Sequence, residues 1–415
     1  MKNIYRSKIL YFTDDPSKYE DKTQSFVYYE DGILITENGR ILFVGEYTQA
    51  INTLQIQKND IDESFKNNLI IPGFIDTHVH YPQTEIIGSF GEQLLLWLEK
   101  YTFPTEMKFQ DTTYSKKIAE FFVQELFKNG TTSAMVYTTV FKESCDTLFE
   151  VANKYNMRIL AGKILMDRNV PDKLQDTAQL GYEDSEELIK KWHEKNRLLY
   201  TITPRFAPTS TKEQLNLAGN LKEKYPSTYI QTHLSENKDE IKWVKSLYPD
   251  NLNYLDVYDS FGLVTSRSVF GHCIHLEQSE LQTLKEKKAS VSLCPTSNLF
   301  LGSGLFKIRE LKQHNIKIGF GTDVGAGTSF NMFKTLSEAY KIVSLEQNTI
   351  DRKPLGVFEA FYQATLGASI SLKLENKIGK LETDYEADFI VLDFAVNDLM
   401  DLKIKIIEEN NKNSF

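Results

Sequence analysis

The chain has 415 residues, of which 41% are hydrophobic and 25% charged, and its formal net charge is −9. This is the composition of a soluble globular protein with a sizeable core, and the length suits several domains or one large barrel with an accessory module. An acidic protein repels phosphate backbones, so we expect no nucleic-acid partner. No apolar run approaches the ~18 residues of a membrane span, so we expect no membrane partner.

Three cysteines, Cys145, Cys273 and Cys294, lie far apart in the sequence. Few cysteines at such spacings favour reduced thiols over a disulfide framework. The first apolar run, residues 9–12, is too short for the core of a signal peptide. We therefore expect a cytoplasmic protein.

Both ends of the chain contain short strand-like runs. Residues 32–36 and 40–44 flank Asn38-Gly39, a pattern typical of a β-hairpin. Strand-like runs return after residue 370, at 377–381 and 387–393. We predict that residues 1–68 and 371–415 together form a small β-sandwich built from both chain ends.

Between these ends, residues 69–370 alternate short apolar runs with amphipathic helical stretches. In residues 115–128, for example, Ile118, Phe121, Phe122 and Leu126 recur at the offsets of one helical face. Strand-like runs recur about every 35 residues, as they do in a (β/α)8 barrel. The eight runs are residues 74–80, 133–139, 158–164, 199–206, 229–236, 268–274, 289–294 and 316–323. We therefore predict an α/β fold with a (β/α)8 TIM-like barrel, and a doubly wound open sheet is the alternative.

The first predicted barrel strand ends with two histidines, His78 and His80. Residues i and i+2 of a strand point to the same side, so both imidazoles should face the barrel interior at the carboxyl end, where barrel active sites lie. Two adjacent imidazoles suit a borderline metal such as zinc. For this motif alone, two ordinary polar strand-end residues are an equally good interpretation.

Three further predicted strands end in residues suited to metal binding or proton transfer, which favours the metal interpretation. His233 and Glu236 follow the fifth strand, His272 the sixth and Asp323 the eighth. Three imidazoles and a carboxylate with a bound water match a catalytic metal site, and these ligand types suit both Zn²⁺ and Fe²⁺. The predicted metal ligands are His78, His80, His233 and Asp323.

The same residues suggest a division of labour in catalysis. A bound metal lowers the pKa of its water towards neutrality. Glu236 is placed to carry protons beside a substrate, and His272 to orient the water or polarise the attacked centre. We therefore predict catalytic roles for Glu236, His272 and Asp323.

The other histidines and one cysteine are expected to be structural. His193 and His314 lie in charged helical stretches and are expected at the surface. His275 follows the sixth strand and is expected to support the site rather than bind metal. Cys294 has no cysteine near it and is expected to be a packed thiol.

Four motifs resemble those of the amidohydrolase superfamily: residues 72–80 (PGFIDTHVH), 232–236 (THLSE), 271–273 (GHC) and 321–323 (GTD). The likeness continues to residues 378–381 and 387–393. It implies a metal-bearing (β/α)8 barrel with a flanking β-sandwich, and a homodimer. No lysine stands at the end of the fourth predicted strand, where Arg205 and Phe206 lie, so we expect one zinc ion per subunit.

Within this superfamily, residues 80–83, 94–106 and 204–209 resemble the members that act on guanine. Guanidinium and amide groups can hydrogen-bond to a purine edge, and aromatic rings can cover its face. The residues expected to bind substrate are Gln83, Trp97, Arg205, Phe206 and His233. For Trp97, a core position on a leucine-rich helix is an equal alternative. We expect hydrolysis of guanine to xanthine and ammonia in purine catabolism, with Glu236 protonating N3 as water attacks C2.

Other functions stay open at this point. An aminohydrolase of the same fold would act on 8-oxoguanine, methylthioadenosine, an S-adenosyl compound or a triazine. A relative without metal would serve as a non-catalytic scaffold, although no predicted ligand is missing. The zinc signature of the other deaminase fold is not met, because Cys294 has no cysteine two or three residues further on.

Overall fold

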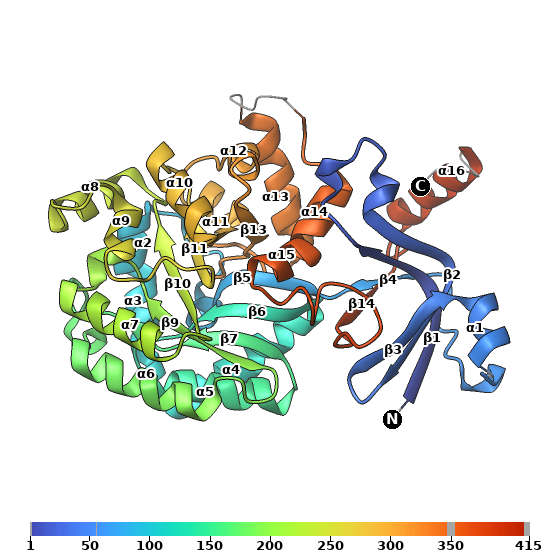
Figure 1. The fold of residues 1–415 in the computed structure, drawn as a ribbon, viewed down its shortest axis with the longest axis horizontal. Helices are drawn as coiled ribbons and strands as arrows, with labels where there is room; N and C mark the ends of the chain where they lie inside the picture. Colours follow the sequence, from blue (N-terminus) through green and yellow to red (C-terminus); the bar gives the residue numbers. More distant parts are fainter. Residues whose placement is uncertain (1, 55, 347–352, 411–415) are drawn as a thin grey trace. The chain divides into compact units, whose positions relative to one another are not determined.

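The computed structural model of the protein describes residues 2–54, 56–346 and 353–410. The chain divides into two compact units (Figure 1). One contains the residues up to Gly73 together with those from Glu375 onward, and the other runs from Phe74 to Leu374. Segments far apart in the sequence therefore build the first unit, whereas the second is continuous.

The first unit is organised around a five-stranded sheet in the order β14-β4-β1-β2-β3. Its elements are β1 (Lys2–Phe12), β2 (Phe26–Glu37), β3 (Arg40–Glu46), α1 (Tyr47–Leu54), β4 (Leu69–Pro72), β14 (Phe389–Leu392) and α16 (Asp398–Asn410). The predicted hairpin is confirmed: β2 and β3 are antiparallel, and Asn38 and Gly39 between them have φ angles of 51° and 77°. β4 pairs with β1 and β14, whereas the sequence analysis places residues 69–72 at the start of the barrel.

The second unit confirms the predicted (β/α)8 barrel. Eight parallel strands follow one another round the sheet. They are β5 (Phe74–His80), β6 (Thr131–Tyr137), β7 (Arg158–Gly162), β9 (Leu198–Pro204), β10 (Tyr229–Leu234), β11 (Ser268–His272), β12 (Ser290–Leu293) and β13 (Lys317–Phe320), and the short β8 (Ile164–Leu165) pairs with β9. The ring closes through backbone hydrogen bonds of 2.9 Å from Asp323 N to His78 O and from His80 N to Val324 O. An open doubly wound sheet is thereby excluded.

Helices surround the barrel strands (Figure 1). They are α2 (Leu94–Trp97), α3 (Phe103–Glu106), α4 (Thr112–Lys128), α5 (Lys142–Lys154), α6 (Ala178–Trp192), α7 (Lys212–Lys224), α8 (Lys238–Leu247), α9 (Tyr254–Asp259), α10 (Gln278–Lys287), α11 (Pro295–Phe300), α12 (Ile308–Gln313), α13 (Met332–Leu345), α14 (Val357–Ala364) and α15 (Leu366–Ser371). A π-helical turn, Leu98–Thr102, joins α2 to α3, so residues 94–106 form one helical segment.

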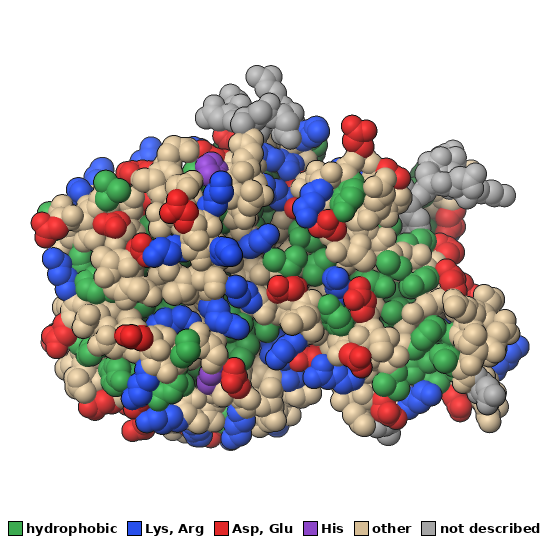
Figure 2. All heavy atoms as spheres, viewed as in Figure 1, with side chains coloured by type: hydrophobic (Ala, Val, Ile, Leu, Met, Phe, Trp, Pro, Cys, Tyr) green, Lys and Arg blue, Asp and Glu red, His purple; other side chains and the backbone are tan. Residues whose placement is uncertain are grey.

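Charge on the surface is mixed. On the face shown in Figure 2, basic and acidic side chains are interspersed rather than gathered in one patch. That face offers no extended basic track of the kind that a nucleic-acid backbone needs. Of the helices among the described residues, none is both long enough and apolar enough to cross a membrane.

Two side chains differ from the sequence analysis. Phe121 does not share the buried face of α4: 49% of it is exposed, whereas the neighbouring Phe122 is fully buried. Consecutive helical residues point about 100° apart, and only Phe122 points towards the barrel. The surface position predicted for His193 is wrong, because only 7% of its side chain is exposed. Its Nδ1 accepts a hydrogen bond of 3.0 Å from the backbone N–H of Tyr200.

The two phenylalanines of α4 give a direct test of this packing. Phe122 lies in ring contact with Tyr81 and Phe330. We expect Phe122→Ala to lower the free energy of unfolding by about 3–5 kcal/mol, because it leaves a cavity. The matched Phe121→Ala change should cost less than about 0.5 kcal/mol. Urea denaturation of both variants measures this, and equal losses would contradict the assigned helix face.

Candidate active site

The centre of the site is the histidine pair at the end of β5. His78 and His80 are 1% and 2% exposed, and their Nε2 atoms lie 3.3 Å apart. The alternation of side chains along a strand places both rings on the same side. Burial lowers the pKa of His80 to about 4, so this imidazole is neutral near pH 7 and offers a lone pair.

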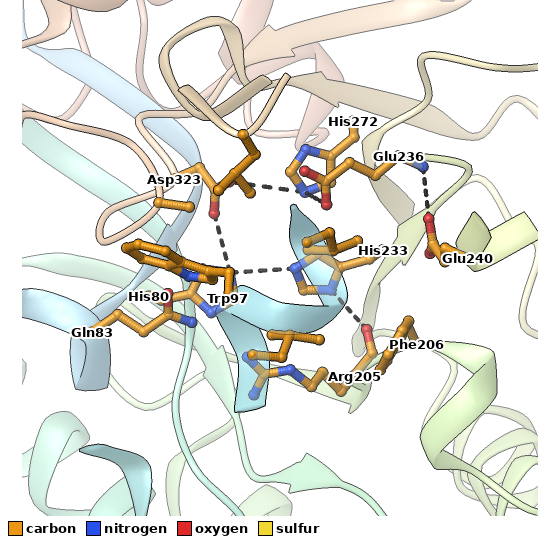
Figure 3. A pocket seen from close by; sticks show the side chains of 14 residues that line it. His80, Gln83, Trp97, Arg205, Phe206, His233, Glu236, Glu240, His272 and Asp323 are labelled. Atoms are coloured by element: carbon orange, nitrogen blue, oxygen red, sulfur yellow. Dashed lines mark hydrogen bonds and ion pairs between the residues drawn. The ribbon is translucent and has the colours of Figure 1, made fainter. Parts of the chain in front are cut away.

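The third imidazole comes from β10, on the far side of the barrel mouth. His233 Nδ1 lies 2.7 Å from the backbone oxygen of Arg205. A carbonyl oxygen only accepts, so Nδ1–H donates this bond and the lone pair sits on Nε2. That Nε2 atom lies 3.3 Å from Nε2 of His80 (Figure 3). The backbone therefore fixes the tautomer that a metal ligand needs.

A carboxylate completes the cluster. Asp323 follows β13 with a φ angle of 51°, and its Oδ1 lies 3.3 Å from His78 Nε2 and 3.2 Å from His80 Nε2. Burial alone would raise the pKa of Asp323, but the nearby imidazoles of His78, His80 and His272 outweigh it. The pKa therefore lies well below its usual value, and the group is an anion.

These four residues fit a single metal ion. Neighbouring donors of a tetrahedral zinc ion are about 3.3–3.4 Å apart when each lies about 2.0–2.1 Å from the metal. Four of the six separations between these donor atoms are 3.2–3.3 Å. Imidazole nitrogens and a carboxylate oxygen are also ligands that zinc and ferrous iron accept. The donors predicted from the sequence thus come together from β5, β10 and the end of β13.

A second set of donors overlaps the first and includes a thiol. His78, His272, Cys294 and Asp323 also offer donor atoms within 4.8 Å of one another. Burial raises the pKa of Cys294 well above its usual value, and its Sγ lies 3.7 Å from the backbone oxygen of Ser292. These features describe a packed, protonated thiol that donates to the backbone. The three histidines form a group of their own within the same limit, and Asp323 lies close to two of them, so these four residues are kept as the candidate metal site.

Glu236 lies beside this cluster as a buried acid. It is 2% exposed, and its Oε2 lies 3.4 Å from His272 Nε2. Burial, the negative charge of Asp323 and that of Glu240 all raise the pKa of Glu236 well above its usual value. Ser303 Oγ donates to Oε1 at 3.0 Å. A carboxyl group in this setting holds a proton that it can deliver.

His272 presents an N–H group to the same space. Nδ2 of Asn298 donates to His272 Nδ1 at 2.9 Å, so the ring proton sits on Nε2. This Nε2 atom is buried and has no hydrogen-bond partner among the described residues. It faces Glu236 and lies 3.9 Å from Oδ2 of Asp323 (Figure 3). His272 is therefore set up to donate to an atom that enters the site.

A pocket opens onto these groups, with an empty volume of about 420 Å³ that includes space open to solvent. Trp97 and Phe206 form apolar walls, and Arg205 and Gln83 supply polar groups (Figure 3). Trp97 is only 1% exposed and packs on Tyr101, so it is both a core residue and part of the pocket wall. All residues predicted to contact substrate line this one pocket.

The sequence analysis missed two residues that matter here. Tyr137 ends β6, is fully buried and stacks on His80 with a centroid separation of 4.5 Å. Glu106, the last residue of α3, forms an ion pair with Arg205. A tyrosine at the end of a barrel strand was a usable signal. The sequence around Glu106 contains no comparable signal, because its partner Arg205 lies 99 residues away.

Comparisons with known proteins agree with this geometry. The model of the Amidohydrolase family matches residues 69–414. The chain is 50% identical to a guanine deaminase of Escherichia coli over 92% of this chain and 86% of that protein.

Two solved structures resemble this one closely. An E. coli guanine deaminase matches with a TM-score of 0.93 and 48% identity over 97% of this chain and 92% of that one. A guanine deaminase from C. acetobutylicum with guanine bound in its active site matches with a TM-score of 0.87 and 32% identity over 98% and 95% of the two chains. The chain therefore belongs to the amidohydrolase family, in the group that contains these guanine deaminases.

Proposed function

We propose that this protein hydrolyses guanine to xanthine and ammonia, using one cation held by His78, His80, His233 and Asp323. The observation that carries the proposal is the single pocket in which this donor cluster adjoins a buried acid, two aromatic walls and a polar edge. Guanine is flat, apolar on its faces and polar on its rim, and it is small enough for such a pocket. The guanine deaminases to which the chain is similar support the same substrate.

The donor set favours zinc as the cation. A divalent cation bound there supplies Lewis acidity, which makes a water molecule acidic enough to act as a nucleophile near neutral pH. His78, His80 and His233 contribute imidazole nitrogens, and Asp323 contributes a negative charge. Burial lowers the pKa of His80 and of His233, which favours their neutral forms. His233 is held in its ligating tautomer by the backbone of Arg205.

The pocket walls place the purine against this cluster. Phe206 and Trp97 bound it with apolar surface, and Phe206 is itself packed against Trp243. Arg205 and Gln83 face the rim of the ring and hydrogen-bond to its polar atoms. His233 lines the same pocket and lies beside the bound base. These contacts hold the purine ring in one orientation relative to the catalytic groups, which lowers the entropic cost of the reaction.

Glu236, His272 and Asp323 move the protons. Glu236 donates its proton to N3 of the ring, which makes C2 electrophilic. Water adds to C2 while Asp323 accepts its proton and the Nε2–H group of His272 orients the oxygen. Glu236, now a carboxylate, takes the proton of the new C2–OH group and transfers it to the amino group at C2. The C2–N bond then breaks to release ammonia and leave a carbonyl group at C2, and Asp323 returns its proton to Glu236. The balance is guanine plus water to xanthine plus ammonia.

Three wider features belong to the same proposal. The three cysteines are buried and unpaired, which agrees with a cytoplasmic location. Xanthine and ammonia are products of guanine catabolism, so we assign the protein to that process. The family resemblance favours a homodimer, which light scattering of the purified protein would test.

Assays with a small set of nucleobases test whether guanine is the substrate. We expect purified protein to remove the guanine absorbance and release one ammonia per guanine consumed. Adenine, cytosine and 8-oxoguanine should be turned over at least about 100-fold more slowly, because they leave polar groups of the site unpaired or overfill it. Faster release of ammonia from 8-oxoguanine than from guanine would point to a different aminohydrolase.

The role of Glu236 is tested by Glu236→Gln. The amide keeps the shape of the side chain but has no acidic proton, so we expect turnover of guanine to fall by about 100-fold or more. Metal content, measured by elemental analysis of the same sample, should stay at the wild-type level. A variant with full metal and full activity would remove Glu236 from the mechanism.

The role of His78 is tested by filling the space beside it. A Cβ atom at Gly271 would lie 2.5 Å from Cε1 of His78, so Gly271→Ala must displace the imidazole. Overpacking of this kind costs about 1–3 kcal/mol, and we expect zinc affinity to fall by about tenfold or more in competition with a chromophoric chelator. Gly356→Ala is the control, since nothing lies within 4 Å of its new Cβ. Equal affinities in both variants would argue against His78 as a ligand.

A further inference from the structure

One buried carboxylate contacts two of the pocket's polar groups and has no part in the proton transfers. Glu106 is fully buried, and its Oε1 and Oε2 lie 2.8 and 2.9 Å from Nη1 of Arg205. Arginine is charged at every relevant pH, and a buried guanidinium needs a counter-charge close by. The carboxylate of Glu106 supplies this counter-charge and therefore fixes the position of the Arg205 side chain.

The carboxylate of Glu106 also faces the side-chain amide of Gln83. This amide is near enough to Glu106 to act against the rise that burial causes in the pKa of that carboxyl group. A carboxylate only accepts hydrogen bonds, so the NH₂ end of the amide must face it. On the other side, the backbone N–H of Gly325 donates to Oε1 of Gln83, and the nitrogen and oxygen lie 3.4 Å apart. A backbone N–H only donates, so both neighbours select the same orientation of the amide.

This orientation decides what the pocket offers to a ligand. Gln83 has its oxygen turned to Gly325 and one N–H turned to Glu106, which leaves one N–H group for the pocket. Arg205 has five N–H groups and uses one nitrogen on Glu106, so its free groups also donate. The edge of the pocket formed by Gln83 and Arg205 is thus an edge of donors alone.

Such an edge distinguishes between purines. A purine with a carbonyl group at C6 presents acceptors there, at O6 and N7. A purine with an amino group at C6 would set its N–H groups against those of Gln83 and Arg205. Buried donors without acceptors are costly, so a site of this type rejects the wrong partner strongly.

We propose that Glu106 is the positioning residue that makes this edge donor-only, and so selects a purine with a carbonyl group rather than an amino group at C6. The inference rests on the proposed function, because it concerns how that site recognises its base. Glu106 itself does not line the pocket and acts only through Gln83 and Arg205. The helical segment of residues 94–106 therefore supplies both the Trp97 wall and the residue that sets the polarity of the edge.

A pair of substrates isolates this effect. Guanine and 2,6-diaminopurine carry the same amino group at C2 and differ in the group at C6 and in the proton that guanine carries on N1. In Glu106→Gln, the new amide can donate to Oε1 of Gln83, so only the N–H of Gly325, at 3.4 Å, still favours the original orientation. Gln83 can then turn and offer its oxygen to an amino group. We expect the ratio of kcat/KM for guanine to that for 2,6-diaminopurine to fall by about tenfold or more. Most of the change on guanine should appear in KM. Glu106→Asp keeps the charge and should keep the ratio within about threefold.

Two further variants separate this role from a purely structural one. Glu359 is also a buried carboxylate, paired with Arg309 and Lys312, and it does not line the pocket. Glu359→Gln should leave the ratio unchanged, whatever it does to stability. If Glu106→Gln does not fold, the Gln83→Met variant provides the test. We expect it to lower kcat/KM for guanine and to leave kcat/KM for 2,6-diaminopurine unchanged.

The outcomes distinguish the inference from the proposed function. An unchanged ratio in Glu106→Gln, with guanine still turned over, would overturn the inference alone. A Gln83→Met variant that loses more activity on 2,6-diaminopurine than on guanine would do the same. Wild-type protein that releases no ammonia from guanine would overturn the proposed function itself.

Discussion

The structure depends on one electrostatic constraint: electron-rich atoms of three imidazoles and one carboxylate must be held close together, away from water. Each of these atoms lies 3.2–3.3 Å from at least one of the others. Lone pairs this close repel unless a positive charge lies between them, and the buried setting leaves little solvent to screen that repulsion. A single cation would remove this repulsion, which is why we propose that the cluster binds a metal and that the rest of the pocket is arranged around it.

The barrel is built to hold that arrangement. Asp76 accepts hydrogen bonds from the backbone of His78 and from the backbone and hydroxyl of Thr322, which ties the end of β5 to the segment that carries Asp323. Gly271 leaves room for the His78 ring where any side chain would collide with it. Around the cluster, two of the imidazoles have a partner that fixes the ring proton: a backbone oxygen for His233 and Asn298 for His272. By our inference, Glu106 similarly fixes the orientation of the donors at the pocket edge. Proton positions in this site are thus set by neighbours that are not themselves reactive.

The sequence predicted those features that depend on local periodicity and on the ends of strands. The eight strands, the two histidines of β5 and the gathering of polar strand ends follow from alternation, spacing and barrel topology. Features that depend on contacts between distant residues could not be predicted in this way. Glu106 meets Arg205 only after the barrel has formed, and Phe121 and Phe122 differ only in which side of α4 faces the strands. His193 looked like a surface residue because its sequence neighbours are charged, yet its ring is needed by a backbone N–H of the next strand.

X-ray absorption at the metal edge of the purified protein tests the central claim most directly. The account predicts about one metal ion per chain, surrounded by nitrogen and oxygen atoms at about 2.0–2.2 Å and by no sulfur. A sulfur atom at about 2.3 Å from the metal would instead place the ion among His78, His272, Cys294 and Asp323. That result would contradict both the ligand set and the catalytic use of His272.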